Sequence, residues 1–286
     1  MLGPMTTSTQ PPSAAPSPDA DASESFQITV EAAELYEAAF VPSFFAQWAP
    51  VLCDLAGVEA GDRVLDVACG TGIVARTAAE RTGPAGRVIG LDLNEAMLDV
   101  ARRVGPGVDW RRGDAASLPF PDRGFDVVLC QMALMFFPDR PAAVGEMARV
   151  VTGGGTVGLL VPSALEAQPM FEPFVGLATR LAGPTARSLL TSYLVCGDLD
   201  EMTALVGAAG LRVTTARRVD GWYRAPSVDA AVTTEVESTP LVERMSEATY
   251  RQLRREAGDL LARFTDAEGR LEAPFECLAV AATAAD

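Results

Sequence analysis

The middle of the chain alternates between short apolar runs and stretches with helical composition. The apolar runs have the length of buried strands and cover 64–68, 88–93, 108–114, 125–131 and 156–162, the third being weaker. Helical stretches lie between them, among them Ile73 to Arg81 and Pro141 to Val151. Strands that alternate with helices predict a parallel sheet wrapped on both faces.

The segment before this alternation is predicted to be helical. Its apolar side chains recur at intervals of three and four residues, as at Leu35, Ala39, Phe40 and Phe44. Pro42 lacks a backbone N–H and interrupts the pattern, so we predict two helices here. Residues 1–23 are rich in Pro, Ser, Ala and Thr with few large apolar side chains, which predicts a disordered tail.

The last part of the chain supplies two more strands and a well-marked helix. Asp198, followed three residues later by Glu201, is typical of a capping box, and the helix it opens should end at Gly210. The runs 211–217 and 275–283 predict the final strands.

Residues 163–197 and 222–272 have mostly helical propensity and fall outside the alternation. Insertions at these points can cover the carboxyl edge of the sheet, where open α/β folds bind ligands. We therefore predict an α/β fold: a Rossmann-like, seven-stranded, mostly parallel sheet with helices on both faces. The expected organisation is one domain over 24–286, with an N-terminal helical cap at 24–58, a ligand-binding core at 60–162, and the two helical insertions as further cover.

Composition excludes several kinds of chemistry. The chain has a formal net charge of −15 and contains neither His nor Lys, which excludes mechanisms that need an imidazole or a lysine amine. A nucleic-acid backbone would be repelled by this charge, so no nucleic-acid partner is expected. The 5 Cys are scattered without a CxxC pair, so we expect no metal site and a reducing, cytoplasmic setting. No apolar run reaches the roughly 18 residues that span a bilayer, so no membrane partner is expected.

The first strand runs into a glycine-rich turn flanked by acids. Gly70-Thr71-Gly72 follows VLDVA (64–68) after Cys69, and a helix begins at once. Such a turn lets backbone amides approach a ligand, but by itself it is a weak signal that also fits a turn without any ligand. Asp66 lies beside the turn, and Asp92 ends the second strand 20 positions after Gly72, where a ribose-binding acid belongs in this type of fold. Asp114 ends the third strand, where an acid can accept a hydrogen bond from an adenine amine.

The turn does not suit a dinucleotide. Position 75, where a dinucleotide motif has its third glycine, is Ala, and Asp66 would repel a pyrophosphate. S-adenosylmethionine has no phosphate and carries an ammonium and a sulfonium, which acids attract.

Four blocks of sequence carry a family resemblance: VLDVACGTGIVA (64–75), GLDLNEAML (90–98), GDAASLPFPDRGFDVVLC (113–130) and EMARVVTGGGTVGLLVP (146–162). Together they resemble the successive motifs of class I S-adenosylmethionine-dependent methyltransferases, above all the small-molecule branch similar to ubiquinone and menaquinone biosynthesis methyltransferases. The resemblance covers about residues 60–162, and Gly153 departs from it where the family often has Pro. It is specific for the family and not for a substrate.

The resemblance implies S-adenosyl-L-methionine as cofactor and a role for each matching residue. Along the methionine moiety it places Asp66, Ala68 and Gly70, with Thr71 and Gly72 in the same turn. Around the ribose and adenine it places Asp92, Leu93, Met97, Asp114 and Ala115. For Leu93 and Met97, ordinary core packing is the alternative. Gln131 would face the methionine end and the transferred methyl. Tyr36 is the candidate for an aromatic side chain that closes over the cofactor in this branch, with simple packing as its alternative.

The expected function is methyl transfer to an oxygen, nitrogen or carbon of a small apolar or aromatic molecule. The partner is then a small-molecule acceptor, and a homodimer stays open. Two alternatives remain: a non-methylating reaction with the same cofactor, such as a cyclisation or decarboxylation, and a cofactor-binding regulator without turnover. The sequence leaves the catalytic residues open; the candidates are Tyr36, Glu37, Gln131 and Tyr193, with Glu34, Glu166 and Tyr223 as further possible bases. The apolar segment 132–137 either lines an acceptor pocket or packs under the cap.

Overall fold

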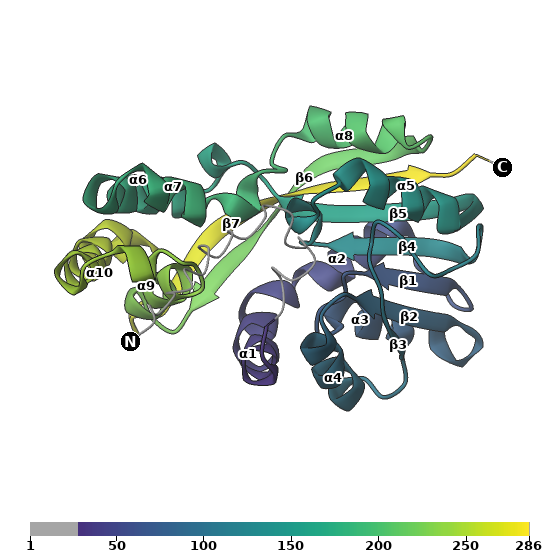
Figure 1. The fold of residues 1–286 in the computed structure, drawn as a ribbon, viewed down its shortest axis with the longest axis horizontal. Helices are drawn as coiled ribbons and strands as arrows, with labels where there is room; N and C mark the ends of the chain where they lie inside the picture. Colours follow the sequence, from purple (N-terminus) through teal and green to yellow (C-terminus); the bar gives the residue numbers. More distant parts are fainter. Residues whose placement is uncertain (1–27, 286) are drawn as a thin grey trace, which may run out of the picture.

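The computed structural model describes residues 28–285 and contains one sheet of seven strands in the order β3-β2-β1-β4-β5-β7-β6 (Figure 1). Five parallel strands form its first part: β3 (Asp109–Arg112), β2 (Arg87–Asp92), β1 (Arg63–Val67), β4 (Phe125–Gln131) and β5 (Val151–Pro162). The strand β7 (Leu271–Thr283) is antiparallel to both of its neighbours, β5 and β6 (Arg212–Ala225). The predicted Rossmann-like, mostly parallel sheet is confirmed, whereas the tail expected at 1–23 lies outside the described residues.

Helices cover both faces of this sheet. The crossovers through α3 (Ile73–Thr82) and α4 (Glu95–Val104) lead from β1 to β2 to β3, and the crossovers through α5 (Arg140–Val150) and α8 (Leu199–Ala208) lead in the opposite direction along the sheet. Because parallel crossovers are right-handed, α3 and α4 lie on one face, and α5 and α8 lie on the other. The helix α2 (Trp48–Ala56) packs beside α3 and against β4, β5 and β7.

Side-chain caps fix where several of these helices begin. Oδ1 of Asn94 accepts from the backbone N–H of Ala96 at 3.0 Å, and the carboxylate of Asp198 accepts from the N–H groups of Asp200 and Glu201. The Asp198 cap was predicted in the sequence analysis above, and each cap is worth about 1 kcal/mol. Gly210, with φ of 82°, ends the turn after α8 as expected.

The N-terminal segment departs from the prediction of two helices separated at Pro42. A short helix α1 (Val30–Leu35) continues directly into a π-helix, η2 (Tyr36–Phe45), which contains Pro42. The break comes later, before α2, and there the helix axis turns by 65°. In the π-helix each N–H pairs with the carbonyl five residues earlier, as when Ala46 donates to the carbonyl of Val41 at 2.8 Å. This shift in hydrogen bonding accommodates Pro42, which lacks an N–H, so the proline does not end the helix.

The last two strands are longer than predicted. We expected β6 to end at 217 and β7 to begin at 275, but β6 extends to Ala225 and β7 begins at Leu271. Since β5 pairs with β7 only as far as Cys277, the pairs from Asp220↔Glu276 to Ala225↔Leu271 form a two-stranded extension beyond the carboxyl end of β5. Part of the segment expected to be helical, 222–225, is therefore strand.

The remaining helices gather around this extension and form a cap lobe, at the left of Figure 1. They are α6 (Phe171–Ala182), α7 (Pro184–Leu190), α9 (Val228–Glu237) and α10 (Glu247–Leu261). Short 3₁₀ turns complete the chain: η3 (Gly83–Ala85), η4 (Leu134–Phe136), η5 (Leu165–Ala167), η6 (Ser192–Leu194), η7 (Val242–Arg244) and η8 (Ala262–Phe264). The carboxyl ends of the parallel strands face the cap lobe and α1, so the candidate site lies between the two parts of the molecule.

The N-terminal segment is attached to the extension by specific packing. The side chain of Gln47 accepts from the N–H of Trp222 at 2.9 Å and donates to its carbonyl at 2.6 Å. Trp48 is fully buried beside Gly221, where an added Cβ would lie 2.3 Å from the indole Cη2. Glycine is thus required at 221 because the tryptophan ring of α2 occupies the space that any side chain there would need.

No single helix among residues 28–285 is long and apolar enough to cross a membrane. The bent pair Val30–Phe45 and Trp48–Ala56 reaches that length and composition only when the two helices are taken together.

Candidate functional site: the carboxyl edge of the parallel strands

The turn after β1 has an unusual backbone. Ala68 and Gly70 both have φ of 55°, and Gly72 has φ of 88° just before α3 begins. An added Cβ at Gly72 would lie 2.1 Å from Cη2 of Trp110, so both conformation and space demand glycine there. On the adjacent strand β4, Met132 has φ of 52° directly after the strand ends. Such strained positions at neighbouring strand ends are typical of ligand-binding turns.

Asp66 is buried beneath this turn. Its Oδ2 accepts from the N–H of Ala75 at 2.9 Å, so the carboxyl group satisfies an amide in the first turn of α3. Burial raises the pKa of Asp66 from 3.8 to about 8, with a smaller contribution in the same direction from Asp92 and an opposing one from the Ala75 hydrogen bond. The structure thus shows Asp66 as a support of the turn, and its contact with a methionine moiety stays a prediction.

Asp92 joins two of the turns at this edge. Its Oδ2 accepts from the N–H of Gly70 at 2.8 Å, and its Oδ1 accepts from the N–H of Asn94 at 2.8 Å. Burial raises the pKa of Asp92, whereas the amides of Asn94 and Gly70 lower it. Each carboxylate oxygen can accept a second hydrogen bond. A pair of ribose hydroxyls is therefore chemically compatible with Asp92 in this position.

The third acid lies just beyond its strand. β3 ends at Arg112, two residues before the predicted end, and the exposed Asp114 accepts from the N–H of Ala116 at 2.9 Å. The turn still reaches the site, because Gly113 donates its N–H to the carbonyl of Asp92 at 3.0 Å. Ala115 is buried in the same turn. This part of the chain forms the side of the site at which the adenine was expected.

Leu93 and Met97 flank that side from the start of α4, and both side chains are half-buried. Partial exposure leaves both roles open for them, packing and contact with a flat ring.

Gln131 ends β4, next to β1 in the sheet. Its Nε2 donates to the carbonyl of Phe45 at 3.3 Å, whereas its buried Oε1 has no hydrogen-bond partner within 28–285. The buried hydroxyl of Thr71, in the glycine turn, likewise lacks a partner in that part of the chain. Unsatisfied buried polar atoms are rare and suit a ligand that supplies the missing hydrogen bonds. An acceptor oxygen at Gln131 matches the ammonium of a methionine moiety.

The N-terminal segment closes over the glycine turn. A Cβ added at Gly70 would lie 3.8 Å from Cε1 of Tyr36, so the tyrosine ring sits on the turn as expected of a closing aromatic side chain. Burial, followed by the nearby acids Asp92, Glu37 and Asp66, raises the pKa of the Tyr36 hydroxyl. The raised pKa favours the neutral hydroxyl of Tyr36 over its phenolate, and a catalytic role for Tyr36 stays a prediction.

Glu37 fastens this segment to α3. Its Oε1 accepts from Nη2 of Arg76 at 2.8 Å, and Nη1 of Arg76 donates to the carbonyl of Thr71 at 2.9 Å. The sequence offered Glu37 as a possible catalytic group, and the structure shows its carboxylate in a partly buried ion pair. Arg76 was not recognised in the sequence, because a single Arg within an amphipathic helix gives no distinguishing pattern.

Tyr193 lies apart from the glycine turn, in the cap lobe. Its hydroxyl donates to Oε2 of Glu235 at 2.8 Å, and the hydroxyl of Tyr223 donates to Oε1 at 2.9 Å. Glu235 was missed in the sequence although a signal was present: it stands within the apolar positions 228, 231, 232 and 236 of a helix, where a charged residue is unexpected. Glu166 is exposed and its carboxylate lies 3.8 Å from Nη2 of Arg187, and Glu34 pairs with Arg103 on the surface.

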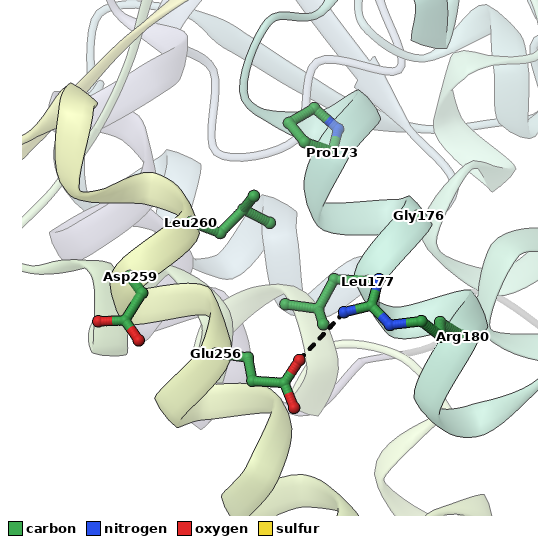
Figure 2. Close-up of a pocket in the computed structure, with 7 residues that line it drawn as sticks. All are labelled: Pro173, Gly176, Leu177, Arg180, Glu256, Asp259 and Leu260. Carbon is green, nitrogen blue, oxygen red and sulfur yellow. Dashed lines mark hydrogen bonds and ion pairs between the residues drawn. The ribbon is translucent and has the colours of Figure 1, made fainter.

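A groove between α6 and α10 shows none of the predicted site residues (Figure 2). An ion pair between Arg180 and Glu256, 3.0 Å apart, bridges the two helices there. Leu177 and Leu260 supply the apolar part of its lining. The groove lies between two helices of the cap lobe and shares no residue with the carboxyl edge of the sheet.

Known proteins resemble this chain in sequence. Residues 64–155 match the family model described as "Methyltransferase domain". The chain is 33% identical over 184 residues to the ubiquinone/menaquinone biosynthesis C-methyltransferase UbiE of Pseudomonas putida, a match that covers 58% of this chain and 72% of that protein. It is 41% identical over 135 residues to nocamycin O-methyltransferase of Saccharothrix syringae, which covers 46% of this chain and 48% of that protein, so the match spans about half of that relative.

Solved structures agree on the fold. A phosphoethanolamine N-methyltransferase of Haemonchus contortus, solved with phosphomonomethylethanolamine and S-adenosylhomocysteine, superposes with a TM-score of 0.56 at 21% identity. The superposition covers 93% of this chain and 60% of that one. At this identity the likeness establishes the architecture alone.

Proposed function

The chain belongs to the class I S-adenosylmethionine-dependent methyltransferases, in the branch similar to UbiE, and from this premise we propose that it methylates a small apolar or aromatic molecule. The observation that carries the proposal is the convergence of Gly70, Asp92 and the unsatisfied Gln131 Oε1 at one edge of the sheet. These groups suit a ligand with a ribose and an ammonium. We propose Asp66, Ala68, Gly70, Thr71, Gly72, Asp92, Leu93, Met97, Asp114, Ala115 and Gln131 as the residues that hold it.

The bound cofactor supplies an electrophilic methyl group on a sulfonium. The chain has to hold it and to align the acceptor. In the proposal, Asp92 holds the ribose hydroxyls, and Gln131 holds the methionine end. Tyr36 covers the turn and excludes water. Proximity and orientation of this kind can lower a barrier by about 7–11 kcal/mol, against a general base that adds only about 10²–10⁴-fold. We therefore propose that alignment dominates and that no single side chain is indispensable as a base.

The acceptor class follows from the side chains between the strands and the cap lobe. The half-buried ring of Phe44 lies 5.1 Å from that of Phe45 and 4.9 Å from that of the buried Phe275, measured between ring centroids. The buried Phe171 lies behind Phe275, at 5.6 Å. An apolar or aromatic molecule suits such surroundings best.

The decisive experiment uses S-adenosylmethionine labelled in its methyl group. Incubation with hydroxylated aromatic acceptors should transfer the label to the acceptor. If an acceptor is converted but carries no label, the function is a non-methylating reaction such as a cyclisation or decarboxylation. If the protein binds the cofactor but converts none of the acceptors tested, the function is that of a cofactor-binding regulator. Asp92→Ala should weaken cofactor binding by about 1.5–3 kcal/mol because hydrogen bonds to a charged acceptor are lost.

A further inference from the structure

The cap lobe contains a buried carboxyl group that the proposed transfer does not use. Glu235, on α9, is only 9% exposed and receives hydrogen bonds from the hydroxyls of Tyr193 on η6 and Tyr223 on β6. Within residues 28–285 no Arg forms an ion pair with Glu235. Burial of an acid without a cationic partner is unfavourable in free energy, so a buried acid of this kind points to a role beyond packing. We name these three side chains the Tyr–Glu–Tyr triad.

Aromatic rings connect the triad with the glycine turn. The ring of Tyr223 lies 5.8 Å from that of Phe44, Phe44 lies 5.1 Å from Phe45, and Phe45 lies 4.9 Å from Tyr36, which covers Gly70. Tyr36, Phe44 and Phe45 are all half-buried. The row of rings thus begins above the glycine turn and ends at Tyr223, the buried member of the triad. A flat molecule of more than one ring could lie along it.

The hydrogen bonds of the triad fix what it can offer to such a molecule. The hydroxyls of Tyr193 and Tyr223 both direct their protons at the carboxyl oxygens of Glu235, which accept them. Burial is the largest influence on Glu235 and raises its pKa, and the two donated hydrogen bonds offset part of that rise. The hydroxyl oxygens of Tyr193 and Tyr223 are left with lone pairs and no free proton. Tyr223 and Glu235 are buried and Tyr193 is half-buried, so Tyr193 is the most exposed member of the triad.

Resting on the proposed function, we propose that the Tyr–Glu–Tyr triad binds the end of the acceptor that lies away from the transferred methyl. It recognises a hydroxyl group there, because the triad presents acceptors and no donor. The substrate class that follows is an aromatic molecule of two or more rings with a hydroxyl at its far end. In this role Glu235 is a positioning residue that acts through Tyr193.

The test measures equilibrium binding of two probes to the protein saturated with S-adenosylhomocysteine. The first is a naphthalene with one hydroxyl on each ring, and the second is its dimethyl ether, which cannot donate. Wild-type protein should bind the diol about tenfold more tightly than the ether, as expected for one hydrogen bond. Tyr193→Phe should remove most of this preference while affinity for the ether stays within about twofold. Glu235→Gln should lower this preference by less than Tyr193→Phe does, because its amide nitrogen can donate to only one of the two tyrosines.

Matched controls come from the same lobe. The half-buried Tyr250 donates to the exposed Glu237 at 3.0 Å, a second Tyr–Glu pair outside the triad, so Tyr250→Phe and Glu237→Gln should leave both affinities unchanged. Unfolding temperatures of all variants show whether the lobe stays folded. Equal losses for diol and ether, an unchanged preference in Tyr193→Phe, or a wild type that binds neither probe would each overturn the inference. If wild type fails to bind S-adenosylhomocysteine itself, the proposed function fails, and the inference falls with it.

Discussion

At the scale of single residues, the site depends on space as much as on charge. Gly72 has φ of 88° and lies against Trp110, whereas Gly61 has a similar φ of 91° with open space around it. Gly61→Ala should therefore cost only the conformational strain of roughly 1–2 kcal/mol. Gly72→Ala should cost a further 1–3 kcal/mol or so from overpacking and should also weaken cofactor binding.

Chemical denaturation of both variants measures this difference. The double variant Gly72→Ala with Trp110→Leu replaces the indole by a smaller side chain. It should therefore recover part of the stability that Gly72→Ala loses. Equal losses for the two single alanine variants would show that the tryptophan can move aside.

The buried carboxyl of Asp66 predicts a pH dependence of stability. Its pKa is raised from 3.8 to about 8 in the folded protein, so the folded state holds a proton that the unfolded state releases. This contribution is fully present below about pH 4 and is lost as the pH rises through about 8. Between pH 5 and 7.5 the free energy of unfolding of the parent should therefore fall, relative to Asp66→Asn, by up to about 1.4 kcal/mol per pH unit.

Asp109→Asn is the control for this measurement. Arg111 and Arg87 lower the pKa of Asp109 in the folded protein. The stability that Asp109 contributes is therefore lost only as the pH falls through this lowered pKa, which lies below the measured range. Unfolding curves that run parallel with pH for the parent and Asp66→Asn would contradict a protonated Asp66.

At the scale of elements, a partly buried ion pair helps to hold the N-terminal segment on the glycine turn. Glu37 and Arg76 are about one-fifth exposed, whereas the Glu34–Arg103 pair of the same segment is about half exposed. Exposed pairs contribute about 0–1 kcal/mol, and removal of one partner from a more buried pair costs more. We expect Glu37→Gln to weaken S-adenosylhomocysteine binding about threefold to tenfold, and Glu34→Gln to change it less than about twofold.

Calorimetric titration with both variants checks this expectation. The dissociation rate should rise more than the association rate falls, because the pair holds the segment closed after binding. An unchanged affinity in Glu37→Gln would show that the ring of Tyr36 alone keeps the segment in place.

At the scale of the whole molecule, the net charge of −15 should influence which form of the cofactor binds. The sulfonium of S-adenosylmethionine carries a positive charge that S-adenosylhomocysteine lacks. Because salt screens long-range attraction, raising the ionic strength from roughly 0.02 to 0.3 M should weaken binding of the charged form about twofold to fivefold. Binding of the neutral sulfide should change little. Equal salt dependence for the two ligands would show that only the local contacts matter.

The sequence by itself determined the sheet, the helices that cross over it, and the residues at the strand ends. These features follow from local rules: apolar runs, capping side chains such as Asn94 and Asp198, and glycines that alone tolerate the turn at 70–72. It also pointed to Tyr36 and Gln131, although through a family resemblance and not through any local pattern. The position of the break in the N-terminal helix was wrong because proline permits a π-helix when the surrounding backbone re-registers.

Only the tertiary structure decided how the late part of the chain is arranged. Residues 220–225 and 271–276 pair with each other across more than forty intervening residues, and local propensity cannot report such a pairing. The same long-range folding brings Tyr193, Tyr223 and Glu235 together from three separate elements. Hydrogen bonds and ring contacts of this kind depend on distances in space, so the sequence contains these residues but does not show that they are in contact.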